Sequence, residues 1–237
     1  MIGNVGAIGQ SSLKRLLAYS SVAQAGYMLA GVVVTTRLGI QATIFYLAGY
    51  VLMNLAAFAV IVARERETGR GDDISSLYGL GSDRPALAWP MTIAMLSLAG
   101  FPATVGFFGK LYLIQAAVNN EYAWLGVVIV LGSAISLVYY LRVIAAVWMR
   151  APSEGEGRLA ALTTARGGEP RPLMAGGSIE ADEEEAAVAQ PLGTRIAQPE
   201  VIVVAVVCAV ATVFFGIYPS PLFDVAQDAG AALTNLI

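Results

Sequence analysis

The 237-residue sequence contains no histidine and a single cysteine, Cys208. The lack of histidine removes the commonest metal ligand and the side chain best suited to relaying protons near neutral pH. One cysteine excludes an intramolecular disulfide and a cysteine-ligated cluster, so Cys208 is expected to pack as a small hydrophobic residue. No glycine-rich nucleotide loop follows a strand-like segment. We therefore expect no redox cofactor and no metal in this chain.

Charge is also scarce. Charged residues make up 13% of the sequence, about half the proportion that is usual in soluble proteins. Hydrophobic residues make up 57%, and several apolar runs reach the 18 or more residues that cross a bilayer. This composition excludes a water-soluble enzyme and gives no reason to expect a nucleic-acid partner. It predicts an all-α fold, a polytopic membrane helix bundle of about five spans. The first ten residues lack the basic segment and long apolar region of a cleavable signal peptide.

The predicted spans divide the chain into three regions. Residues 1–150 contain four spans, at about 13–34, 41–63, 86–118 and 122–149. Residues 151–198 are rich in Gly, Pro, Ala and Glu and are expected to form a disordered loop. Residues 199–237 contain the last span, followed by apolar positions spaced as in an amphipathic helix that lies on the membrane surface.

Basic residues are distributed unevenly between the two sides of this predicted bundle. Eleven Lys and Arg residues lie on the side of the N-terminus and the 151–198 loop, and Arg37 alone lies on the other. Because basic residues accumulate on the cytoplasmic side, the N-terminus and the long loop are predicted to be cytoplasmic and the C-terminus external. Lys110 then lies in the outer half of the third span.

The third span, Ala86 to Asn119, is the most informative stretch. A Gly100–Phe101–Pro102 sequence interrupts it, small residues continue to Gly106, and Lys110 follows deep in an apolar environment. A buried ammonium beside a broken helix is costly, which points to function, and the freed backbone groups need water or polar partners. Two simpler readings are that Gly and Pro are common in membrane helices and that lysine extends its charge toward the interface.

Other polar residues inside the predicted spans have both structural and functional readings. Gln24 and small neighbours suggest helix packing. Asn54, near mid-membrane, is more often a hydrogen-bond partner between helices than a proton site. Lys14 either lines a proton path or anchors its helix to lipid phosphate. Arg142 either extends to the interface or pairs with a carboxylate of a neighbouring helix.

Two motifs now carry a resemblance to a known family. The stretches S-L-K-R-L-L-A-Y-S-S from Ser12 and L-A-G-F-P-A-T-V-G-F-F-G-K-L-Y from Leu98 resemble the antiporter-like membrane subunits of respiratory complex I. A third stretch, S-A-I-S-L-V-Y-Y-L-R-V from Ser133, favours the subunit N group, to which mitochondrial NADH dehydrogenase subunit 2 corresponds. The resemblance covers residues 1 to about 150 well and the last span by position only.

The resemblance implies a proton-translocating subunit of an NADH-quinone oxidoreductase in a bacterial inner membrane. Family members have about fourteen helices, including two inverted repeats, each with one broken helix. The five spans resemble the tenth to fourteenth helices, and Met1 to Gly9 resembles the end of the ninth. Lys110 matches the lysine of the second broken helix, which belongs to the proton exit route. Gln24 is a departure, since relatives often carry a histidine there.

The resemblance also implies partners. The chain is expected to lie in lipid beside other membrane subunits of complex I. NAD, FMN, iron–sulfur clusters and quinone are expected in partner subunits, and none in this chain. Three alternatives stay open on the sequence: a subunit of a multisubunit sodium–proton antiporter, a structural spacer in a membrane assembly, and a subunit of a related photosynthetic or hydrogenase-linked complex.

Overall fold

The computed structural model describes residues 1–68, 71–149 and 199–234. Within these ranges the chain is helical, and no strand is formed apart from an isolated bridge between Ser12 and Asp73. The prediction of an all-α bundle is confirmed for this part of the chain. The expected disordered loop at 151–198 lies outside the described residues.

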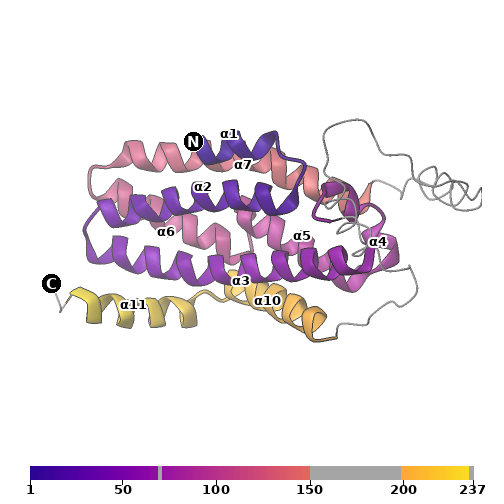
Figure 1. Cartoon of the computed structure of the whole chain (residues 1–237). Helices are drawn as coiled ribbons and strands as arrows, with labels where there is room; N and C mark the ends of the chain where they lie inside the picture. The colour runs from indigo at the N-terminus through magenta and orange to yellow at the C-terminus, as the bar shows by residue number, and fades with distance from the viewer. Residues whose placement is uncertain (69–70, 150–198, 235–237) are drawn as a thin grey trace, which may run out of the picture. The chain divides into compact units, whose positions relative to one another are not determined.

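Three helices open the fold (Figure 1). Helix α1 covers Ile2–Ile8, α2 covers Leu13–Val33 and α3 covers Arg37–Thr68. The Ser12 side chain accepts a hydrogen bond from the backbone N–H of Arg15, at 3.2 Å, and thereby caps the start of α2. Helix α3 is longer at both ends than the predicted span 41–63.

The segment after α3 is more ordered than a plain solvated loop. The helix continues through the charged residues Arg64 to Glu67, followed by a 3₁₀-helix, Ile74–Leu77, and the short helix α4, Leu80–Asp83. The backbone N–H of Leu13 donates to the carbonyl of Asp72 at 2.6 Å. This contact joins the segment to the start of α2.

The predicted third span consists of two helices, as the Gly-Phe-Pro sequence indicated. Helix α5 covers Pro85–Ala99 and α6 covers Val105–Asn119, with 15 residues each. A 15-residue helix rises about 22 Å, less than the ~30 Å hydrocarbon core of a bilayer. Neither half alone is therefore long enough to cross, and the two together form one discontinuous span.

The remaining helices of the described residues are α7, Ala123–Trp148, α10, Pro199–Ile217, and α11, Ser220–Thr234. Four described helices, α2, α3, α7 and α10, are long and apolar enough to cross a membrane. Helix α11 buries Ala226 and Gly230 and exposes Asp224 and Asp228, so it is amphipathic as predicted. Its position on a membrane surface stays a prediction.

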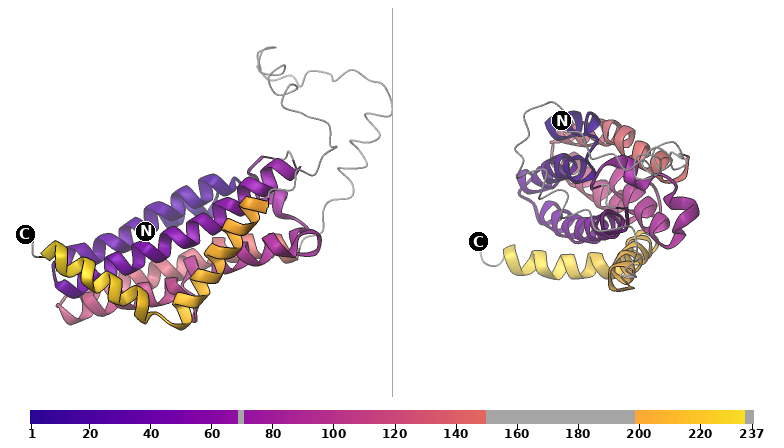
Figure 2. Two further views of the ribbon diagram at one scale, coloured as in Figure 1. Left: turned by 90° about the horizontal axis from the view of Figure 1, so that it is seen from below. Right: turned by 45° about the vertical axis from the view of Figure 1, so that its right-hand side comes forward.

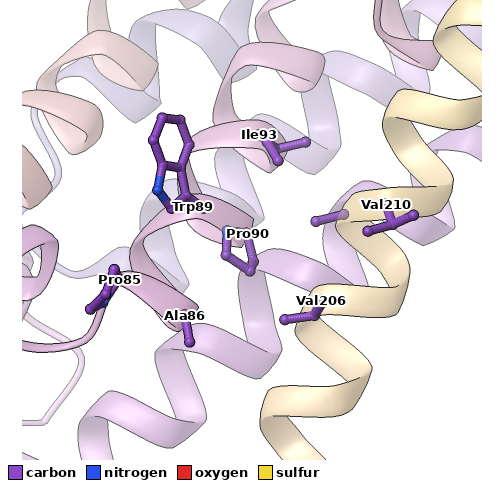
Figure 3. Close-up of a pocket in the computed structure, with 8 residues that line it drawn as sticks. Pro85, Ala86, Trp89, Pro90, Ile93, Val206 and Val210 are labelled. Carbon is purple, nitrogen blue, oxygen red and sulfur yellow. The ribbon is translucent and has the colours of Figure 1, made fainter.

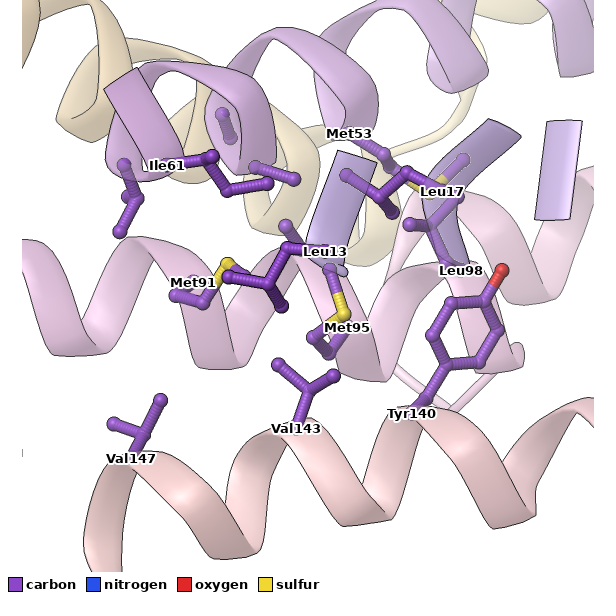
Figure 4. Packing of buried hydrophobic residues seen from close by; sticks show 14 of the residues in the cluster. Leu13, Leu17, Met53, Ile61, Met91, Met95, Leu98, Tyr140, Val143 and Val147 are labelled. Atoms are coloured by element: carbon purple, nitrogen blue, oxygen red, sulfur yellow. The ribbon is translucent and has the colours of Figure 1, made fainter. Parts of the chain in front are cut away.

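Helix α3 contacts more of the bundle than its neighbours do. It packs against α2, α5, α6, α10 and α11, and Figure 2 shows it lying between α2 and the α10–α11 pair. The largest apolar cluster lies where α2, α3, α5 and α7 meet (Figure 4). Leu13, Met91, Met95 and Val143 interdigitate there, and each is almost completely buried. Cys208 is also buried, as expected for a small hydrophobic residue.

Apolar side chains also cover the outer faces of the long helices. Val127, Val130 and Val138 of α7 are more than half exposed, as are Val207 and Val210 of α10. A surface of this kind is unfavourable in water and matches hydrocarbon. Together with the length of the helices, it makes this a multi-pass membrane protein.

Arg142 has a structural role. Its guanidinium donates to the carbonyl oxygens of Ile8 and Gln10, each at 3.2 Å. These carbonyls lie at the end of α1, where a helix leaves acceptors without partners. Arg142 therefore joins α7 to α1 through backbone acceptors, which neither sequence reading specified.

Candidate functional site: a lysine at a broken helix

The site begins where α5 ends. Gly100 adopts a left-handed conformation, φ 90°, and its N–H donates to the carbonyls of Leu96 and Ser97 at 3.1 and 2.9 Å. The N–H of Phe101 also donates to Leu96, at 2.9 Å. This pattern terminates helices and favours glycine, because a side chain is strained at positive φ. Pro102 follows directly and has no N–H with which to continue the helix.

The chain then turns back into α6 at close range. The N–H of Gly106 donates to the Ser97 hydroxyl at 3.1 Å, so the first turn of α6 lies against the last turn of α5. A Cβ atom at Gly106 would overlap the carbonyl oxygen of Ser97. Glycine is therefore required at this crossing.

Lys110 lies on the second turn of α6 and is 5% exposed. Its Nζ donates to the carbonyl oxygens of Leu98 and Ala99, at 2.8 and 3.1 Å. In a continuous helix the Leu98 carbonyl would accept from residue 102, and Pro102 cannot donate. The lysine therefore occupies the place of a missing backbone donor.

The lysine charge has no carboxylate partner in the described part of the chain. No Asp or Glu there forms an ion pair with Lys110. The charge is stabilised instead by the C-terminal end of α5, where aligned carbonyl dipoles give a partial negative charge. Burial opposes the ammonium form, and this helix end favours it.

Gln24 joins the site from α2. It is completely buried, and its Nε2 donates to the Leu98 carbonyl at 3.2 Å and to the Tyr140 hydroxyl at 3.1 Å. Its Oε1 accepts from the Tyr46 hydroxyl. The predicted residues Lys110 and Gln24 therefore share one acceptor, the Leu98 carbonyl.

Two tyrosines and a serine of this cluster were not identified from the sequence. Tyr46 on α3, Tyr140 on α7 and Ser20 on α2 are buried, and Ser20 is hydrogen-bonded to Tyr140. A Cβ atom at Gly109 would overlap the Tyr46 ring, so Gly109 provides its space. A signal was present in α2, since Ser20 and Gln24 are four residues apart and share one helical face.

Comparison with known proteins assigns the fold. Residues 1–136 match the family described as NADH:quinone oxidoreductase/Mrp antiporter, TM. The chain belongs to this family. Chloroherpeton thalassium NADH-quinone oxidoreductase subunit N 2 is 46% identical over 157 residues, covering 65% of this chain and 30% of the relative. Heliobacterium modesticaldum NADH-quinone oxidoreductase subunit N is 36% identical over 233 residues, covering 98% and 41%.

Chains of two solved structures have a similar fold. A chain of respiratory complex I from Thermus thermophilus with bound aureothin has a TM-score of 0.67 and 29% identity, covering 94% of this chain and 42% of that one. A chain of the Mrp complex from Dietzia sp. has a TM-score of 0.73 and 26% identity, covering 98% and 44%. The chain spans less than half the length of these relatives.

Two other predicted site residues, Lys14 and Asn54, lie outside the hydrogen-bonded cluster around Lys110. Lys14 forms an ion pair with Glu65 of α3, with Nζ 2.8 Å from Oε2, and its side chain is 46% exposed. Asn54 is half-buried, and its side chain has no hydrogen bond to another described residue. A part for Lys14 or Asn54 in proton transfer stays a prediction.

The break is also in contact with α10. A Cβ atom at Gly216 would overlap Thr104 and the Ala103 carbonyl, so α10 lies directly on the residues that join α5 to α6. An apolar groove lies between α5 and α10, away from the break, and is lined by Trp89, Ile93 and Val206 (Figure 3). It contains no polar group suited to proton transfer.

Proposed function

We propose that this chain is part of a proton-translocating membrane subunit of an NADH-quinone oxidoreductase and that Lys110 is its proton site. The observation that carries the proposal is the buried ammonium of Lys110 on the carbonyls of a broken helix, with no carboxylate partner among the residues that the structure describes. The names of the curated relatives, NADH-quinone oxidoreductase subunit N, supply the enzyme complex.

The geometry suggests how the proton is held. A backbone carbonyl accepts a hydrogen bond but cannot take the proton. Both oxygen partners of Lys110 Nζ are backbone carbonyls, so this arrangement suits the loaded state. Release requires Nζ to move from Leu98 and Ala99 toward water or another acceptor.

A charge that moves in a neighbouring subunit can drive this change. At an effective dielectric constant of 20, a unit charge 10 Å away contributes about 1.7 kcal/mol. That energy alters the ratio of loaded to empty lysine by more than tenfold. Redox chemistry in this scheme belongs to partner subunits, which hold NAD, FMN, iron–sulfur clusters and quinone.

We extend the proposal to the location of the chain. It lies in a bacterial inner membrane with its N-terminus in the cytoplasm and its C-terminus outside, in contact with lipid and with other membrane subunits. The excess of basic residues on one side supports this orientation. Lys110 then lies in the outer half of the membrane, on the exit side.

The test is Lys110→Ala in the full-length parent within the assembled complex. We expect NADH-driven proton uptake into inverted membrane vesicles to be abolished or strongly reduced, with assembly intact on native gels. Gln115→Ala is the matched control, since Gln115 is exposed on the same helix. Normal uptake by the Lys110→Ala vesicles would overturn the proposal and support a structural spacer.

The second candidate is a subunit of a sodium–proton antiporter. The similarity to a chain of the Mrp complex, at a TM-score of 0.73, favours it. The same vesicles distinguish the two functions. Proton movement that depends on a sodium gradient and not on NADH would support the antiporter.

A further inference from the structure

A third partner of the Lys110 ammonium lies on α2. Nζ is positioned over the ring of Tyr27, 5.3 Å from the ring centroid, and Tyr27 is 4% exposed. A cation at this distance from an aromatic face is attracted by the electrons of the ring, more strongly when water is excluded. An ammonium has three N–H groups, and two carbonyls and the ring together account for them.

The Tyr27 hydroxyl is hydrogen-bonded to α1, and its partner there is bonded in turn to α7. Its hydroxyl accepts from Nδ2 of Asn4 at 2.9 Å. Asn4 is completely buried on α1, donates to the Gly132 carbonyl of α7 at 2.8 Å, and accepts from the Tyr139 hydroxyl at 2.9 Å. Two hydrogen bonds, with Gly132 and Tyr139, therefore hold the Asn4 amide, and its third hydrogen bond holds Tyr27.

Space for the Tyr27 hydroxyl depends on a glycine. A Cβ atom at Gly132 would lie 2.6 Å from the hydroxyl oxygen, closer than such atoms approach without movement. Asn4 of α1, Tyr27 of α2 and Gly132 of α7 thus meet, and their contacts fix the position of the Tyr27 ring. Nζ of Lys110 lies over the face of that ring.

We infer that Tyr27 is a positioning residue for the protonated form of Lys110 and that Asn4 holds Tyr27 in place. The ring stabilises the ammonium and offers no lone pair that takes its proton, so it favours loading without opening a route for release. This role deepens the proposed function, and its importance in proton transfer rests on that function. It also makes the short helix α1 part of the site.

The chain offers an unusually simple spectroscopic test, because it contains two lysines, Lys14 and Lys110. The whole chain is labelled with [ε-¹³C, ζ-¹⁵N]lysine and placed in lipid nanodiscs. Lys14→Arg and Lys110→Arg assign the two signals. In the wild type, we expect the ε protons of Lys110 to be shifted upfield by the ring current, with the half-exposed Lys14 as the internal reference.

Two substitutions of Tyr27 separate the ring from the hydroxyl. Tyr27→Leu removes the ring, and we expect the upfield shift to disappear. The ratio of protonated to neutral Lys110 should also fall by about tenfold. Tyr27→Phe keeps the ring but loses the hydrogen bond to Asn4, so the shift should be reduced and should not disappear. Asn4→Leu should reduce it, because the ring is then no longer held.

Tyr112→Leu is the matched control. Tyr112 lies on the same helix as Lys110, but its ring packs on Phe45 at a centroid distance of 5.2 Å. We expect this variant to leave the Lys110 signal unchanged. A Lys110 signal that is equally unchanged in folded Tyr27→Leu would overturn the inference.

A measurement on the wild type covers the case in which Tyr27→Leu does not fold. Dipolar dephasing between ¹⁵Nζ of Lys110 and ¹³C-labelled tyrosine rings should match the 5.3 Å separation, and its absence would also overturn the inference. The two proposals fail separately. Normal proton uptake by Lys110→Ala overturns the proposed function alone, and an unshifted wild-type Lys110 signal overturns the positioning role alone.

Discussion

The ammonium of Lys110 and the carbonyl oxygen of Leu98 are 2.8 Å apart, although 12 residues separate them in the sequence. The contact exists because Pro102 leaves that carbonyl without its helical donor. Gln24 donates to the same oxygen. One acceptor at the end of α5 therefore connects the lysine with α2, and changes at the break are expected to reach the lysine directly.

The first prediction concerns Gly100→Ala. A side chain at φ 90° costs about 1–2 kcal/mol, and the new Cβ would lie 3.2 Å from Cδ and 3.3 Å from Nζ of Lys110. We expect lower stability in micelles and reduced proton uptake in the assembled complex. Gly71→Ala is the control, because Gly71 also has positive φ, 63°, with no atom near its Cβ position. Equal loss of uptake in both variants would argue against displacement of the lysine.

The second prediction concerns Gln24→Met. The apolar chain has a similar length, but it leaves the buried hydroxyl of Tyr46 without its acceptor. We expect a loss of about 1–3 kcal/mol in the free energy of unfolding, measured by denaturant titration in micelles. Gln24→Met combined with Tyr46→Phe should cost less than the sum of the single changes, since the orphaned hydroxyl is gone. Strict additivity would contradict the hydrogen bond.

Lys14 gives the third prediction. Its ion pair with Glu65 is about half exposed, so Lys14→Gln should lower stability only slightly, and high salt should remove the difference. We also expect normal proton uptake, because the Lys14 ammonium is paired with the Glu65 carboxylate at the edge of the bundle. A strong loss of uptake with normal assembly would instead place Lys14 on the proton path.

The fourth prediction is a pH dependence outside the spans. The Ser12 hydroxyl, together with the backbone N–H of Lys14, holds the pKa of Asp72 below its ordinary value. A pKa that is lower in the folded chain than in the unfolded one adds stability above the unfolded value, about 3.9. That contribution is lost as the pH falls through the folded value.

Asp72→Asn tests this contribution. We expect a destabilisation of at most about 1 kcal/mol at neutral pH, and a weaker dependence of thermal stability on pH between about 2 and 5. Asp228→Asn, exposed on α11, is the control and should leave the wild-type profile unchanged. An unaltered profile in Asp72→Asn would show that the Ser12 contact does not stabilise the start of α2.

Local chemistry explains which features were predictable from the sequence. A glycine followed by Phe101 and Pro102 ends a helix by its backbone alone, so the break and the two halves of the third span could be foreseen. The length of an apolar run likewise predicts a spanning helix. Lys110 was singled out because a charge in such a run is costly wherever its partners lie.

The partners themselves depend on which helices meet, and sequence spacing does not contain that information. Asn4 is bonded to Gly132, 128 residues away, and Gln24 to Tyr140, 116 residues away. A tyrosine in an apolar run looks like a packing residue until its hydroxyl has a partner. Lys14 is the converse case, since a motif residue proved to have an ordinary partner, Glu65.

The contact between Gly216 and Thr104 has a mechanical consequence. Backbone touches backbone there, with no flexible side chain between the two segments to absorb a displacement. A tilt of α10 therefore either pushes on the residue that begins α6 or opens a gap beside it. Lys110 lies less than two turns further along α6, so steric coupling connects the last long helix of the chain with the position of the ammonium.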